Sequence, residues 1–144
     1  MSSASNSWLM WACLSALFAA LTAIFAKIGV EGIDSDLATF IRTIVVIVVL
    51  GGLLLATGKL SVPREVGNRT WLFLVLSGLG TGASWLCYFR ALKVGEAAKV
   101  APIDKLSVVL VALFSVAFLG ERLPPIAWAG IALIAGGAAL VAIS

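Results

Sequence analysis

Four charged residues lie in predominantly apolar stretches of the sequence, where a charge is hard to accommodate. They are Arg42, Arg90, Asp104 and Lys105. A charge at the centre of a membrane-spanning helix costs about 2.5–3.5 kcal/mol on insertion scales, so such residues usually face a bundle interior and have partners. One acid among three bases could bind an ionic solute or carry a proton. These four residues are therefore the first candidate for a functional site.

The acid of this set, Asp104, needs a partner, and Arg42 or Arg90 could neutralise it. Asp104 and Lys105 are adjacent, about 100° apart on a helix, which predicts that they do not share a face. Pro102 precedes them and either starts the helix without needing a donor or bends it. The alternative is a rim of ion pairs that only holds helices together, because all four charges sit toward one end of their stretches and long side chains can reach the surface.

Polar side chains also repeat at helical spacing in the apolar stretches. One stripe contains Ser77, Thr81, Ser84 and Tyr88, a second contains Trp11, Ser15, Phe18 and Thr22, and a third contains Asp104, Ser107 and Ser115. Three such stripes could line a polar path for a solute. Hydroxyl groups can equally bond to carbonyls of their own helix, so a purely structural role is the alternative. We assign to the expected path, besides the charges, Trp11, Ser15, Thr81, Ser84, Tyr88 and Ser107.

The composition indicates a membrane protein. Of 144 residues, 62% are hydrophobic and 12% charged, with a mean hydropathy of +1.14, whereas soluble domains are about 45–50% apolar and about 25% charged. Apolar segments run approximately over 7–29, 37–57, 70–92, 100–119 and 124–143. About 20 residues suffice to cross a hydrocarbon core of about 30 Å. We therefore expect an all-α integral membrane protein, with five transmembrane helices in one domain of residues 1–144.

Several functions find no support in the sequence. The chain has no His, and its cysteines, Cys13 and Cys87, lack a metal-binding spacing, so we expect neither a metal nor a cofactor. No catalytic constellation can be assembled, which argues against an enzyme. The lysines and arginines are scattered without a basic tract, which argues against binding to nucleic acid.

Positive charges are nearly balanced between the two sides of the membrane. The N-terminal side carries Lys59, Arg64, Arg69 and Arg122, and the other side carries Lys27, Lys93 and Lys99. If the embedded cations reach out to the second side, the bias reverses. A chain without a strong bias can insert in both directions, and oppositely inserted copies can form the inverted pair used for alternating access. We expect an antiparallel homodimer in the lipid bilayer; the alternative is one orientation with a parallel or different partner.

The C-terminal part of the chain carries a family resemblance. The segment "YFRALKVGEAAKVAPIDKLSVVLVALFSVAFLGERLPPIAWAGIALIAGGAALVA" resembles the EamA-like domain of the drug/metabolite transporter superfamily. The similar features are Tyr88, Ala91 and Leu92, then Pro102, the "GER" of residues 120–122, and a last helix with Trp128, Gly130, Gly136 and Gly137. Larger members carry two five-helix repeats in inverted arrangement, whereas this chain resembles the half-size bacterial members with one repeat. Within the motif, we expect Glu121 and Arg122 to fix the turn into Pro124.

The resemblance implies secondary transport, commonly efflux of metabolites or drugs, across the cytoplasmic membrane. Our first hypothesis is a transporter that moves a small organic solute through a polar cavity between two chains. Because embedded cations outnumber the embedded acid, an anionic or zwitterionic solute is favoured if they face this cavity. Asp104 is then the candidate for proton coupling. The alternative is a non-transporting membrane assembly subunit, or half of a heteromeric transporter.

Overall fold

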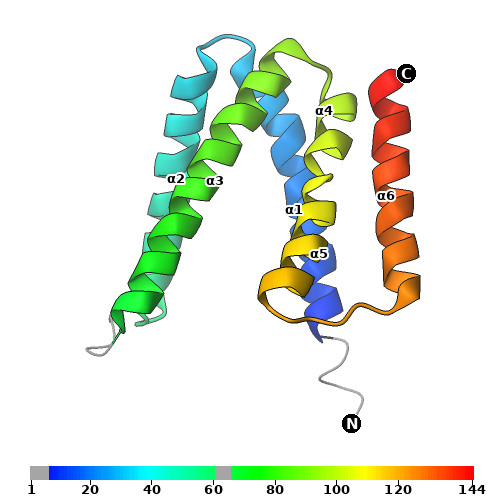
Figure 1. The fold of residues 1–144 in the computed structure, drawn as a ribbon. Helices are drawn as coiled ribbons and strands as arrows, with labels where there is room; N and C mark the ends of the chain where they lie inside the picture. The colour runs from blue at the N-terminus through cyan, green and yellow to red at the C-terminus, as the bar shows by residue number, and fades with distance from the viewer. Residues whose placement is uncertain (1–6, 61–65) are drawn as a thin grey trace. The chain divides into compact units, whose positions relative to one another are not determined.

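The structure, a computed structural model, describes residues 7–60 and 66–144. Within these ranges the chain forms helices and no strands (Figure 1). The helices are α1 (Ser7–Val30), α2 (Ser35–Ala56), α3 (Asn68–Val94), α4 (Ala97–Asp104), α5 (Ser107–Phe118) and α6 (Pro125–Ile143). Helices α4 and α5 together make one span, so the described residues contain five spans long and apolar enough to cross a membrane. The predicted all-α membrane class with five transmembrane helices is confirmed.

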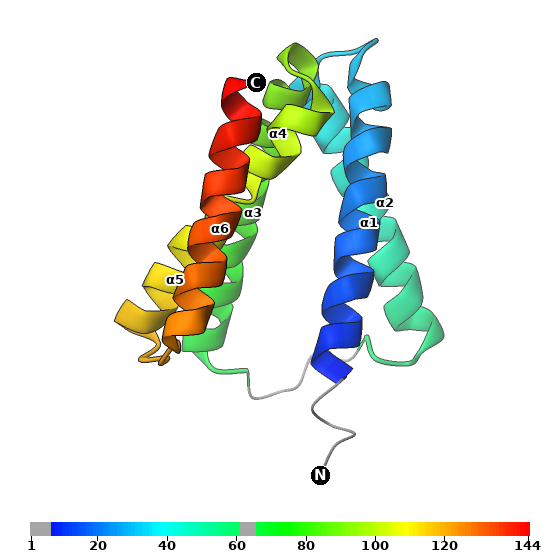
Figure 2. The ribbon, with the colours of Figure 1, turned by 90° about the vertical axis from the view of Figure 1, so that its right-hand side faces the viewer.

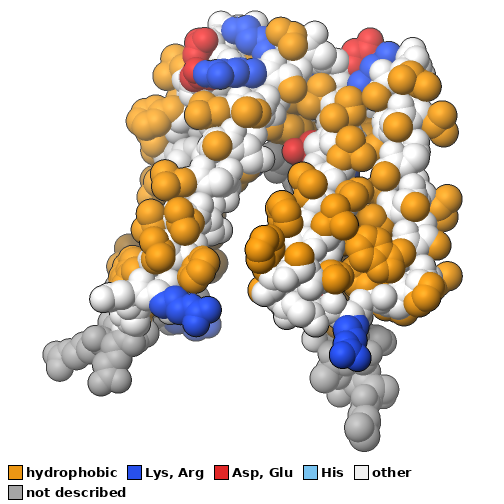
Figure 3. All heavy atoms as spheres, in the orientation of Figure 1, with side chains coloured by type: hydrophobic (Ala, Val, Ile, Leu, Met, Phe, Trp, Pro, Cys, Tyr) orange, Lys and Arg blue, Asp and Glu red, His pale blue; other side chains and the backbone are white. Residues whose placement is uncertain are grey.

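Large apolar side chains remain exposed along the spans. Examples are Phe18, Val48, Leu79 and Leu133, each with more than half of its surface accessible. Figure 3 shows apolar side chains along the lengths of the helices and lysine or arginine side chains gathered near their ends. Such surface is unfavourable in water and natural in a bilayer, where the tails are as apolar as the side chains. The protein is an integral membrane protein.

Local sequence signals define both ends of α2. Asp34 is the N-cap, and its side chain accepts hydrogen bonds from the backbone N–H groups of Asp36 and Leu37, at 2.9 and 3.1 Å. At the other end Gly58 has a φ of +66°. Its N–H bonds to the Leu55 carbonyl, and the N–H of Lys59 bonds to the Leu54 carbonyl. This is the Schellman arrangement, in which a left-handed glycine ends the helix.

The fourth span is interrupted after Asp104. Pro102 lies inside α4, and its ring nitrogen cannot donate to the carbonyl one turn earlier. The N–H of Lys105 is shared between the carbonyls of Ala101 and Pro102, at 3.3 and 3.1 Å, and the N–H of Leu106 bonds to Ile103 at 3.0 Å. Bonds to the third preceding residue are those of a 3₁₀ turn, which is tighter than an α-helix. The span is therefore two helices, with Pro102 inside the first rather than at its start.

The chain divides into two compact parts, one formed by Met1–Ile24 with Val94–Ser144, the other by Phe25–Lys93. In the first part, α6 packs against both α4 and α5. In the second, Val30 and Leu92 are completely buried and Phe89 nearly so. This core lies where the end of α1, the start of α2 and the end of α3 meet. From there α2 and α3 separate toward the loop that joins them (Figure 2). Arg64, one of the cations counted above, lies outside the described residues.

Candidate functional site

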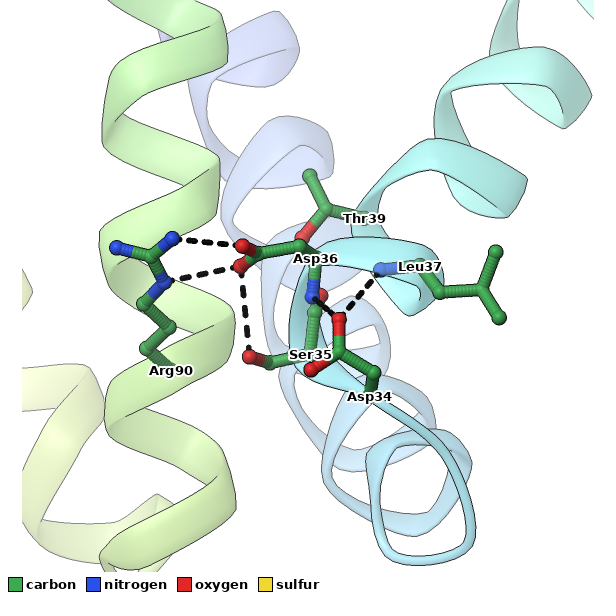
Figure 4. Close-up of polar contacts among 6 residues, drawn as sticks. All are labelled: Asp34, Ser35, Asp36, Leu37, Thr39 and Arg90. Carbon is green, nitrogen blue, oxygen red and sulfur yellow. Dashed lines mark hydrogen bonds and ion pairs between the residues drawn. The ribbon is translucent and has the colours of Figure 1, made fainter.

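An ion pair joins α2 to α3 at the end where these helices converge. Arg90 donates from Nε to Oδ1 of Asp36 at 2.9 Å and from Nη2 to Oδ2 at 2.6 Å (Figure 4). Two parallel charge-assisted bonds are the strongest form of this interaction. Asp36 lies in the first turn of α2 and Arg90 four residues before the end of α3, so each charge also complements the dipole of its own helix. Both side chains remain about half exposed, at 46% and 61%.

Two lysines bond to backbone carbonyls at the same end. Lys27 donates from Nζ to the Leu92 carbonyl at 2.8 Å, and Lys93 donates to the Ile33 carbonyl at 2.6 Å. The Leu92 carbonyl belongs to the last turn of α3, where carbonyls lack an intrahelical partner. We call these two contacts and the Asp36–Arg90 pair the clasp. The clasp ties the end of α1, the α1–α2 turn, α2 and α3 together at one end of the part Phe25–Lys93.

Arg42 lies six residues, about 1.7 turns, further along α2, about 9 Å beyond Asp36 at 1.5 Å per residue. Its guanidinium carbon is 4.0 Å from the centroid of the Trp85 ring and 5.4 Å from that of Phe89. A cation over an aromatic face is attracted by the ring quadrupole, and tryptophan gives the strongest attraction. The phenol of Tyr88 lies within electrostatic range of the same guanidinium. Arg42 is therefore held by aromatic side chains of α3.

The second embedded ion pair is local to the break in the fourth span. Nζ of Lys105 lies 3.1 Å from Oδ2 of Asp104. The two side chains meet at their ends, and the prediction that the two positions do not share a helix face stays a prediction. Helix α4 ends at Asp104 and Lys105 is its C-cap, so the long lysine side chain can reach back to the carboxylate from the turn.

Comparison with known proteins identifies the family. The model of the EamA-like transporter family matches residues 6–143. The chain belongs to the EamA-like transporter family. A curated relative from Sinorhizobium sp., named "Uncharacterized transporter in cobO 3'region", is 61% identical over 139 residues, which cover 96% of this chain and 99% of the relative. No solved structure matches the chain. The resemblance seen in the sequence is thus confirmed, and the protein is a membrane transporter.

The predicted site residues of this EamA-like chain fall into both of its parts. Arg42, Tyr88 and Arg90 are in the part Phe25–Lys93, together with Thr81 and Ser84 of α3. The other part contains Trp11, Ser15, Asp104, Lys105 and Ser107. The structure brings Arg42 and Tyr88 to the same place and gives Arg90 the partner Asp36. A single path that unites the two sets remains a prediction.

One hydroxyl of the predicted stripes and the "GER" turn make contacts with the backbone. Thr81 donates to the Ser77 carbonyl at 2.9 Å, which is the structural alternative considered for this stripe. At the turn, Gly120 has a φ of +68° and the N–H of Glu121 bonds to the Ser115 carbonyl at 3.1 Å. The backbone of Glu121 thus helps to end α5, and the side-chain roles of Glu121 and Arg122 remain predictions.

Sequence reasoning missed the partners of the embedded arginines. Asp36 lies just before the apolar segment of residues 37–57, so it is not among the embedded charges. Trp85 lies between Ser84 and Tyr88 in an apolar run, and its position there does not indicate an arginine partner. A usable signal was available: Asp36 and Arg90 lie near the same membrane side, at the ends of consecutive antiparallel spans. Among the described residues no group of three His, Cys, Asp or Glu side chains could hold a metal.

Proposed function

We propose that the protein is a secondary active transporter that exports or exchanges small organic solutes across the cytoplasmic membrane, working by alternating access as an antiparallel homodimer. One observation carries this proposal: the transporter family match spans residues 6–143 of a chain with five membrane spans. A 61% identical relative of nearly the same length is itself named a transporter. A single repeat of this kind needs a second copy to provide the inverted halves on which alternating access depends.

The distribution of charge supports pairing in opposite orientations. The N-terminal side of the membrane carries four cations and the other side carries three. This count leaves out the embedded Arg42, Arg90 and Lys105. An odd number of spans puts the termini on opposite sides, and a weak positive-inside bias permits both insertions. The interrupted fourth span and the separation of α2 from α3 supply elements that can move in such a cycle.

Transport is tested with purified protein in liposomes. A panel of carboxylates, phosphates, amines and neutral metabolites is first screened for thermal stabilisation, because a bound solute raises the melting temperature. Solutes that stabilise are then loaded into proteoliposomes for counterflow. We expect accelerated exchange of at least one stabilising solute. If no solute stabilises the protein and none exchanges faster than in protein-free liposomes, the transport proposal fails.

Orientation is tested separately by labelling a cysteine at the C-terminus. Ser144→Cys is introduced in a background in which Cys13 and Cys87, both free thiols, are replaced by serine. An impermeant maleimide is applied to intact cells and to inverted vesicles. Labelling of comparable fractions from both sides supports dual insertion. Labelling from one side contradicts the antiparallel homodimer while leaving transport itself open to the first test.

A membrane assembly subunit is the second candidate, favoured by the Asp36–Arg90 pair, which shows that one embedded charge has a structural partner. This candidate predicts that embedded charges can be exchanged between partners without loss of function. It also predicts no solute-dependent stabilisation of the purified chain, so the thermal screen separates the two candidates.

A further inference from the structure

We propose that Arg42, held on the ring of Trp85, binds the anionic group of the transported solute, a carboxylate or phosphate. The inference rests on the proposed function, since it assigns the class of solute that this transporter takes. It goes beyond the count of embedded charges, because the structure separates Arg90, which is paired with an acid, from Arg42, which has no acid partner among the described residues of its part of the chain.

The carboxylates near Arg42 are engaged elsewhere. Asp34 accepts two backbone N–H groups at the start of α2, and Asp36 is bonded through both oxygens to Arg90. Among residues 25–60 and 66–93, no carboxylate lies within 4.0 Å of the Arg42 guanidinium. A cation inside a span without an acid partner is unfavourable, and such residues in transporters commonly mark the route of a substrate.

Arg42 has donors to offer to an acceptor. Its contact with Trp85 is a cation–π contact, with the guanidinium carbon 4.0 Å from the ring centroid, and such a contact uses the charge of the group rather than a hydrogen bond to an acceptor. The five N–H donors of arginine point outward in the plane of the group. This plane matches a carboxylate or a phosphate through two parallel bonds. In Arg90, by contrast, Nε and Nη2 already donate to the carboxylate of Asp36.

The position of Arg42 also suits a solute site. It lies about 9 Å beyond the clasp along α2, at a level where its guanidinium contacts Trp85 and Phe89 of α3. At the same end of this part the cations Lys27, Arg90 and Lys93 are balanced by the carboxylates Glu31, Asp34 and Asp36. The end as a whole therefore does not select an anion, and selection depends on Arg42, whose contacts are aromatic.

The test measures binding rather than transport, in nanodiscs that contain only phosphatidylcholine. Benzoate and phenyl phosphate are the anionic probes, with benzylammonium and benzyl alcohol as cationic and neutral controls of similar size. Binding to the full chain is followed by calorimetry. It is followed also by Trp85 fluorescence in a variant with phenylalanine at positions 8, 11, 71 and 128. We expect saturable binding of an anionic probe and no binding of either control.

Three variants assign the binding to Arg42. Arg42→Gln should weaken anion binding about tenfold or more, the size expected for a charged hydrogen bond. Arg42→Lys should restore it only in part, because lysine has no planar fork. Arg69→Gln is the matched control, since Arg69 lies 5.8 Å from the Phe73 ring near the other end of α3, and it should leave binding unchanged. Equal binding by wild type and Arg42→Gln overturns the proposal, as does failure of both anions to bind.

Lipid headgroups carry the same phosphate chemistry, so a second set of nanodiscs contains phosphatidylglycerol. If Trp85 fluorescence responds to this lipid and to neither soluble anion, Arg42 holds a headgroup and the solute assignment is wrong. The outcome is independent of the flux assay. Anion binding that depends on Arg42 stands even if no exchange is found, whereas exchange that is unaffected by Arg42→Gln refutes the inference and leaves transport intact.

Discussion

Two arginines of the same part of the chain have opposite surroundings. Arg90 is bonded through two nitrogens to Asp36, whereas Arg42 is stacked on Trp85 and Phe89. The Asp36–Arg90 pair joins α2 to α3, and the carboxylate neutralises the charge of Arg90. The ring contacts of Arg42 hold its side chain in position through the charge of the group rather than through a hydrogen bond to an acceptor. The same residue type therefore has a structural role at one position and a proposed binding role at the other.

Replacing Arg90 tests the clasp. Arg90→Gln removes the charge and should lower the melting temperature in detergent. Arg90→Lys should lower it less, since lysine keeps the charge and loses the two parallel bonds. Exchanging the two residues, as Asp36→Arg with Arg90→Asp, should not restore stability fully, because each charge would then oppose its helix dipole. A melting temperature equal to wild type in Arg90→Gln would show that the pair contributes nothing.

The N-cap of α2 offers a cleaner measurement. Asp34→Ala leaves the N–H groups of Asp36 and Leu37 without their acceptor and should reduce the free energy of unfolding by about 1 kcal/mol. Asp34→Asn retains an acceptor oxygen and serves as the control, with a much smaller effect. Unfolding in mixed micelles, followed by circular dichroism, measures both. Similar losses in the two variants would contradict the capping role.

At the scale of single residues, the sequence indicated which charges are embedded but not all of their partners. Asp36 and Arg90 are 54 residues apart, and their pairing depends on how two helices meet, which composition does not specify. The contact between Asp104 and Lys105 depends on a lysine side chain that reaches back from the C-cap of α4, and helical spacing alone does not indicate such a contact.

At the scale of elements, Gly58 shows what ends a helix. Its φ of +66° is unfavourable for residues with a Cβ, by roughly 1–2 kcal/mol, and an added Cβ would meet no atom within 4 Å. Gly58→Ala should therefore reduce stability by about that amount through backbone strain alone. Gly67→Ala is the matched control, because Gly67 is equally unhindered and has no positive φ. Equal stability of the two variants would exclude strain at Gly58.

The interruption of the fourth span is open to a similar test. Pro102→Ala restores the backbone donor toward the Ala98 carbonyl and removes the rigid ring from the turn that precedes the break at residues 105 and 106, which should allow this turn to adopt regular helical geometry. We expect unchanged or increased thermal stability together with slower counterflow, if this break moves during transport. Val100→Ala, in the same helix, is the control for loss of side-chain volume. Unchanged flux in Pro102→Ala would show that the break has no part in the cycle.

The elements themselves follow largely from the sequence. Stretches of about 20 apolar residues permit little besides membrane-spanning helices, and the structure contains five of them. The exact bounds of the helices could not be predicted where local backbone contacts, rather than hydropathy, decide where a helix begins or ends. Helix α2 begins two residues before its apolar segment because Asp34 caps it. The fourth span divides at residues 105 and 106, where backbone bonds go to the third preceding residue, and hydropathy does not register that change.

At the scale of the whole molecule, the proposed antiparallel pair can be tested by complementation. Leu60→Lys adds a cation on the N-terminal side, and Glu31→Lys adds one on the other; both residues are exposed. Each substitution should bias insertion toward one orientation. Either variant expressed by itself should lose most flux, and co-expression of the two should restore it. Full flux from either variant expressed singly would contradict an obligatory antiparallel pair.

The clasp has a mechanical consequence. It pins α2 and α3 at one end, and the 22 residues of α2 reach about 33 Å from that end at 1.5 Å per residue. The pinned end therefore acts as a fulcrum for a long lever arm. A tilt of about 10° there carries the distant end sideways by about 6 Å, comparable to the width of a small organic molecule. Slight adjustments around one bidentate pair are thereby magnified on the opposite face of the bilayer.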